Sequence, residues 1–221
     1  MTQSVDPHLS GRRRPPRIVE QSDAIQKALH ERGIEFSLKN SGGADTEHIV
    51  IELPGERKLK TTVLLTVGKP GVRIEAFVCR RPDENHEGVY RFLLKRNRRL
   101  YGVAYTIDNI GDIYLVGRMS AESVSPGELD RVLGQVLEAA DGDFNTLLEI
   151  GFFTSIRREW AWRVSRGESL RNLLAFEHLI DKENLPTIRP EEGAPEKSVT
   201  ALAQDGPAPT GRAADSGETD S

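Results

Sequence analysis

The first half of the chain contains runs of residues in which apolar and polar side chains alternate. Such alternation, which places successive side chains on opposite faces, predicts β-strands over residues 47–53 and 72–79, and the run 60–67 between them is a third predicted strand. The last two runs are separated only by Gly68-Lys69-Pro70-Gly71. Two strands joined by a short loop rich in glycine and proline are typical of a β-hairpin.

A second hairpin is predicted further along the chain. Residues 101–108 and 112–119 form two runs of strand character around Asn109-Ile110-Gly111. Asparagine and glycine tolerate positive φ angles and therefore favour a tight turn at this point.

Helices are predicted where apolar residues recur every three or four positions, over 18–32 and 84–99. A third helix begins after Ser125, since Ser125 can cap it, Pro126 suits its first position and Glu128 completes a capping box. Further helical segments are predicted over three ranges, 144–153, 155–164 and 169–180.

This order of elements, α-β-β-β-α-β-β-α, indicates an α+β fold in which helices pack on a five-stranded antiparallel sheet. We expect this domain over residues 17–141, with a C-terminal helical extension over 142–180. Residues 1–16 are polar and contain GRRRPP, and we expect a flexible N-terminal arm there. Residues 181–221 are rich in Pro, Gly, Ala, Ser and acids, which predicts a disordered acidic tail.

The net charge of −4 comes from this tail. Seven of the 34 acidic residues and three of the 30 basic residues lie after residue 186, so the rest of the chain carries 27 of each. A neutral body disfavours general binding to polyanions such as nucleic acid, which requires an excess of Lys and Arg. A single cysteine excludes an internal disulfide, and there is no long apolar run and no apolar leader segment. We therefore expect a cytoplasmic protein with no membrane contact.

The sequence contains no recognisable catalytic, nucleotide-binding or metal-binding motif, so we predict no enzyme activity, no cofactor and no metal. Asp108 and Asp112 could offer oxygen ligands, but their spacing is better explained by a turn between two strands. Cys79 precedes two arginines and could be an activated nucleophile, but a small strand residue is the favoured interpretation.

Four aromatic residues in the helical extension are candidates for contact with a protein partner. They are Phe152, Phe153, Trp160 and Trp162. The two tryptophans are two positions apart and cannot share one face of a helix, so one of them could lie at an interface, where tryptophan is enriched. Burial of both within one molecule is the somewhat preferred alternative.

The segment RFLLKRNRRL, residues 91–100, is strongly basic. An anionic ligand or nucleic acid could be bound by Arg91, Lys95, Arg98 and Arg99. The favoured explanation is structural, because positive charge near the end of a helix stabilises the negative end of its dipole.

Residues 88–141 resemble the YbjN-like proteins, which are labelled bacterial sensory-transduction regulators. The residues that match the pattern of that family are Leu93, Leu94 and Asn97 at the helix end and Gly102, Asp108, Gly111, Leu115 and Arg118 in the hairpin. The spacing from Gly102 to Asp108 is one residue longer than in that pattern, and the match is weaker over 18–80.

The resemblance implies a fold like that of the type III secretion chaperones, a homodimer and no catalytic residues. We therefore expect a non-enzymatic bacterial adaptor, chaperone-like or regulatory, that binds a protein partner through a sheet face, a sheet edge or the aromatic extension. The alternative is a regulator that binds nucleic acid or an anionic ligand through the basic helix.

Overall fold

The computed structural model describes residues 15–39, 46–189, 191, 193, 195 and 198–203. The predicted N-terminal arm and the last part of the predicted acidic tail, residues 204–221, lie almost entirely outside these residues. Statements about the fold concern the described residues only.

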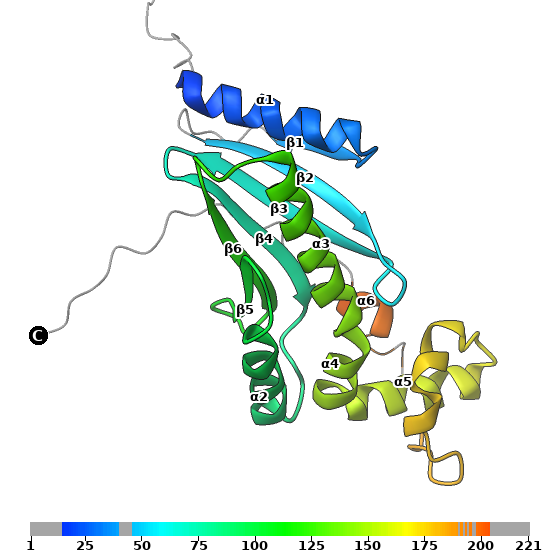
Figure 1. Cartoon of the computed structure of the whole chain (residues 1–221). Helices are drawn as coiled ribbons and strands as arrows, with labels where there is room; N and C mark the ends of the chain where they lie inside the picture. Colours follow the sequence, from blue (N-terminus) through cyan, green and yellow to red (C-terminus); the bar gives the residue numbers. More distant parts are fainter. Residues whose placement is uncertain are drawn as a thin grey trace, which may run out of the picture.

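The centre of the molecule is one antiparallel sheet in the order β1-β2-β3-β4-β6-β5 (Figure 1). The strands are β1 (Phe36–Lys39), β2 (Thr46–Pro54), β3 (Lys60–Gly68), β4 (Gly71–Cys79), β5 (Val103–Ile107) and β6 (Ile113–Ser120). The α+β class is confirmed, and the sheet has one strand more than the five predicted. The additional strand is β1, which pairs with β2 along all four of its residues.

The register of the sheet aligns the apolar residues on one face. Val63 on β3 lies opposite Ile51 and Ala76, and Leu115 on β6 lies opposite Ala76 and Tyr105. These five residues are at most 6% exposed and form a continuous row across five strands. Such a row can be buried only if a second layer covers it.

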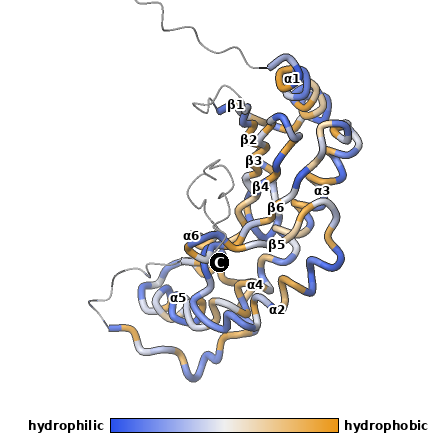
Figure 2. The backbone as a smooth tube through the Cα atoms, turned by 90° about the vertical axis from the view of Figure 1, so that its left-hand side faces the viewer, coloured by the Kyte–Doolittle hydropathy of each residue, from blue (hydrophilic) through white to orange (hydrophobic). Residues whose placement is uncertain are grey.

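Two helices, α1 (Pro16–Glu31) and α3 (Pro126–Gly142), supply that second layer. Figure 2 shows both on the same side of the sheet. The predicted cap of α3 is confirmed, because the Ser125 hydroxyl accepts a hydrogen bond from the Glu128 amide at 3.2 Å. Helix α2 (His86–Asn97) contacts edge strand β5 rather than the centre of the sheet.

The C-terminal part of the chain forms a helical layer at one end of the sheet (Figure 1). It consists of α4 (Phe144–Gly151), α5 (Phe153–Arg166), the 3₁₀ helix η1 (Arg171–Leu179) and α6 (Val199–Ala203). Helix α6 lies within the range for which composition predicts disorder, yet Val199 and Leu202 are buried in the core. Among the described residues, no helix is both long enough and apolar enough to cross a membrane.

Candidate protein-interaction site

Helix α2 carries an exposed face with an apolar centre. Its inner face buries Val89 and Leu93 in the core, whereas Leu94 on the outer face is 68% exposed. The Asn85 side chain caps the helix by accepting a hydrogen bond from the Gly88 amide. A shallow hollow runs along the outer face and is lined by His86, Glu87, Tyr90, Arg91, Leu94, Lys95 and Arg98.

Three of the four predicted anion-binding residues, Arg91, Lys95 and Arg98, line this hollow. Arg99 lies in a neighbouring depression at the end of the helix. Arg91 forms an exposed ion pair with Glu87. Within the described part of the chain, Lys95, Arg98 and Arg99 have no ion pair.

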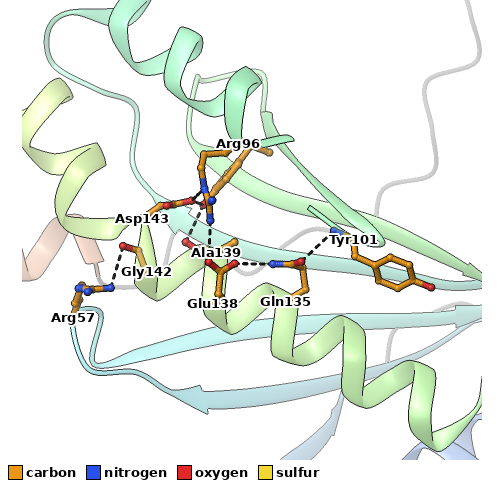
Figure 3. Close-up of polar contacts among 9 residues, drawn as sticks. Arg57, Arg96, Tyr101, Gln135, Glu138, Ala139, Gly142 and Asp143 are labelled. Carbon is orange, nitrogen blue, oxygen red and sulfur yellow. Dashed lines mark hydrogen bonds and ion pairs between the residues drawn. The ribbon is translucent and has the colours of Figure 1, made fainter. Parts of the chain in front are cut away.

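Arg96 belongs to the same basic run but turns inward. Its Nε atom lies 2.6 Å from Asp143 Oδ2, and its terminal nitrogen lies 3.0 Å from Glu138 Oε1 (Figure 3). The Tyr105 hydroxyl, which has a single proton to donate, lies 2.8 Å from Asp143 Oδ2 and 2.9 Å from the Ala139 carbonyl oxygen. Hydrogen bonding to Asp143 raises the pKa of Arg96, and burial raises the pKa of Tyr105. Arg96 therefore serves to fix α2 against the junction of α3 and α4.

Asn97 fixes α2 against the edge of the sheet. Its side-chain amide donates to the Tyr105 carbonyl at 3.2 Å and accepts from the Tyr105 amide at 2.7 Å. The side chain thus satisfies both outward backbone groups of one residue on edge strand β5. This contact gives a physical role to one of the residues that matched the family pattern.

The end of α3 also orders the loop between β2 and β3. One carboxylate oxygen of Asp141 accepts from the amides of Arg57 and Lys58, each at 2.8 Å. The Arg57 guanidinium donates to the Gly142 carbonyl at 3.1 Å (Figure 3). Three adjacent residues, 141–143, therefore hold both this loop and α2 in place.

The four predicted aromatic contacts divide into two pairs. Phe152 is fully buried and Trp160 is 4% exposed, so both are part of the protein's own core. Phe153 and Trp162 are half-buried and have some exposed surface. Contact of this cluster with a partner stays a prediction, and in this conformation only Phe153 and Trp162 could make it.

The alternatives involving a nucleophile or a metal find no support in the local geometry. Burial raises the pKa of Cys79 to about 12, so its thiol is protonated at neutral pH. Asp108 Oδ1 accepts hydrogen bonds from the amides of Ile110 and Asp112, which is the behaviour of a turn residue. Within the part of the chain that the structure describes, no group of three His, Cys, Asp or Glu side chains is placed to hold a metal ion.

Sequence reasoning missed two buried charged residues, Glu159 and Lys58. Glu159 on α5 is 1% exposed and pairs with Arg163 one helical turn later, at 2.8 Å. Lys58 is 2% exposed and donates to the Phe77 carbonyl. The spacing of Glu159 and Arg163 indicated an ion pair, but nothing in the sequence indicated its burial.

Residues 21–149 match the sequence model of the YbjN family, described as "Putative bacterial sensory transduction regulator". An uncharacterized protein of Mycobacterium leprae is 71% identical over 159 residues, which are 72% of this chain and 86% of that protein. An uncharacterized protein of Mycobacterium tuberculosis is 63% identical over 155 residues, which are 70% and 85% of the two chains.

Two solved structures are more distantly similar. The ExsC–ExsE complex contains a chain with 19% identity and a TM-score of 0.43, covering 59% of this chain and 95% of that one. The heterodimeric ExoU–SpcU complex from the type III secretion system of Pseudomonas aeruginosa gives 15% identity and a TM-score of 0.36, with coverage of 58% and 98%. Neither similarity indicates which surface of this chain binds a partner.

Proposed function

The chain belongs to the YbjN family, and on that premise we propose that it is a non-enzymatic, cytoplasmic bacterial adaptor, chaperone-like or regulatory, that binds protein. The observation that carries the proposal is the outer face of α2. Leu94 and the half-buried Tyr90 form its centre, and charged residues surround them. An apolar centre within a polar rim is the usual composition of a protein interface.

The occupant that fits this face best is a second copy of the chain. In an antiparallel pair of α2 helices with a twofold axis beside residues 92 and 93, Glu87 of each copy faces Arg98 of the other. Leu94 then lies close to the axis in both copies. A twofold interface must be complementary to itself, and the order of acidic, apolar and basic residues along α2 meets that requirement.

Light scattering on the full chain tests this homodimer. We expect twice the protomer mass for the wild-type chain and the protomer mass for Leu94→Arg, because residue 94 of each copy faces Arg91 of the other and a guanidinium there meets like charge. Leu59→Arg is the matched control, since Leu59 is 79% exposed but lies on the loop between β2 and β3. A wild-type monomer, or a Leu94→Arg dimer, would contradict the proposal.

A different protein partner is expected to contact the two half-buried aromatic residues of the extension, Phe153 and Trp162. Phe153 lies beside Arg157, whose guanidinium is 5.6 Å from its ring centre, so the surface combines aromatic and cationic character. We expect the variant Phe153→Ala with Trp162→Ala to stay dimeric and to lose a partner recovered with the wild-type chain. The recovered protein is then purified and titrated against both chains, and equal affinities would overturn this contact.

The second candidate function is binding of nucleic acid or an anionic ligand by α2. The observation in its favour is that Lys95, Arg98 and Arg99 are exposed and form no ion pair among the described residues. This function predicts binding that falls steeply with salt and is weakened by alanine at Arg91, Lys95, Arg98 and Arg99. Binding to oligonucleotides that survives these four substitutions would exclude it.

A further inference from the structure

The short helix α6 is held by a site that the body of the protein provides. The Glu159 carboxylate accepts a hydrogen bond from the Val199 amide at 2.6 Å, while its other oxygen accepts from Arg163 Nε at 2.9 Å. Val199 and Leu202 insert into the core, and α6 contacts β4 and η1. The site therefore combines an apolar socket with a buried, fixed hydrogen-bond acceptor.

The helix itself is suited to reversible docking. It has five residues, too few for a helix to form alone in water, because nucleation is unfavourable. Ser198 accepts from the Ala201 amide, and its own carbonyl accepts from the Leu202 amide, so the first turn is capped. Only two side chains in α6 are seen to be buried, and the residues flanking it in sequence are mostly proline, glycine and acids.

We propose that the socket beneath α6 is a peptide-binding site and that α6 is its tethered competitor. The occupant it fits is a short helical segment of a protein partner with the pattern Ser-Val-x-x-Leu, in which a capping hydroxyl precedes a branched apolar residue and a leucine follows three positions later. Partner segments of this kind are typically short apolar stretches within a polar chain, and they become helical only when they bind. The chain is still attached to the body at Leu185, which packs against the core, so α6 has a high local concentration at the socket. A partner segment must therefore bind better than α6 to displace it.

This inference deepens the proposed function by giving the partner a contact surface, but its test uses neither a partner nor a variant of α2. Failure here would thus leave the α2 proposal standing, and failure of the α2 proposal would leave this site standing. The probe is a labelled synthetic peptide spanning residues 195–205, added to the full chain.

In the full chain, Val199→Asp together with Leu202→Asp should release α6 and empty the socket. We expect saturable binding of the peptide to this variant and at least tenfold weaker binding to the wild-type chain, where α6 competes. The same peptide with both aspartates should not bind. Adding Glu159→Gln to the emptied variant should weaken binding several-fold, because the charged acceptor of the Val199 amide is lost. Both tryptophans lie on α5 with Glu159, so intrinsic fluorescence gives a second readout.

Absence of saturable binding to the emptied variant, in a chain that still unfolds cooperatively, would overturn the proposal. Should that variant fail to fold, hydrogen exchange in the wild-type chain decides. We expect the Val199 and Leu202 amides to exchange far faster than those of α3, and equal protection would make α6 a fixed part of the core. A wild-type dimer that becomes monomeric when only α6 is altered would show exchange of α6 between copies and would also overturn it.

Discussion

At the scale of single residues, Asn97 shows how a side chain can end a sheet. Its amide group forms the two hydrogen bonds to Tyr105 that a neighbouring strand would otherwise form. Gly102, another residue of the family pattern, has φ of +70°, a conformation that a residue with a Cβ atom rarely adopts. Both residues could be recognised in the sequence, but their roles depend on contacts that no spacing reveals.

Asn97→Ala should destabilise the protein by about 2 kcal/mol, because two hydrogen bonds to partly buried backbone groups are lost. Urea denaturation measures the change. Asn109→Ala is the control, since Asn109 is exposed in the second hairpin turn and should change stability by less than about 0.5 kcal/mol. Equal effects of the two substitutions would show that the hydrogen bonds of Asn97 to β5 contribute little to the free energy of unfolding.

His48 gives the stability of the sheet a dependence on pH. Burial lowers its pKa below 6.5; the charge of Lys39 lowers it further, and Glu75 partly opposes both. The unfolded chain therefore takes up a proton at higher pH than the folded one, so stability should fall as pH drops from 6.5 through the folded pKa. Melting temperatures at pH 7.5 and pH 5 should differ less in His48→Gln than in the wild-type chain.

The matched control for His48 is His30→Gln, at an exposed position on α1. We expect it to keep the pH dependence of the wild-type chain. If His48→Gln and the wild-type chain lose the same stability between the two pH values, His48 is not the source.

At the scale of elements, the long periodic segments were predictable and the short ones were not. Strand β1 was missed because its four residues, FSLK, have no buried side chain and become a strand only by pairing with β2. Helix α6 was missed because it has only five residues, too few for apolar spacing to predict a helix, and the chain around it is rich in proline, glycine and acids. The helix expected over 169–180 is a 3₁₀ helix, a distinction that apolar spacing does not make.

The candidate site was predictable in part. The exposed basic residues of α2 were singled out, but the inward turn of Arg96 depends on Asp143, 47 residues later. Similarly, the burial of Phe152 and Trp160 follows from how α4 and α5 pack against the rest of the chain. Contacts between distant parts of the sequence therefore decide which members of a cluster reach the surface.

The cap of α3 provides a prediction at this scale. Ser125→Ala should destabilise the protein by about 1 kcal/mol, because the Glu128 amide loses its acceptor. Ser125→Asp should preserve stability, since a carboxylate caps equally well and suits the helix dipole. Thermal unfolding followed by circular dichroism measures both, and similar losses for the two variants would contradict the role of the cap.

At the scale of the whole molecule, residues 141–143 link parts of the chain that are far apart in sequence. Asp141 binds the loop between β2 and β3, and Asp143 binds both Arg96 on α2 and Tyr105 on β5. These contacts join the sheet, helix α2 and the C-terminal helices at one point. The position of the proposed interface on α2 thus depends on residues that never reach it.

Arg96→Leu should destabilise the protein by about 2 kcal/mol, less than the loss of a fully buried ion pair, because the Arg96 side chain is 22% exposed and Asp143 keeps its bond to Tyr105. Arg99→Leu, at an exposed position just after the end of α2, is the matched control and should change stability by less than about 0.5 kcal/mol. Guanidinium denaturation compares the two. A small effect at Arg96 would mean that α2 is positioned by apolar packing alone.

The hydrogen bonds between Asn97 and edge strand β5 also limit how two molecules can join their sheets. Because Asn97 occupies the outward backbone groups of Tyr105, a strand added beside β5 would first have to displace it, which favours addition beside β1 at the opposite end. Two molecules could share such an addition by placing their β1 strands together, and growth would then stop. A chain of molecules joined strand to strand would need two open ends on each, so the contact between Asn97 and Tyr105 opposes the growth of fibres from this sheet.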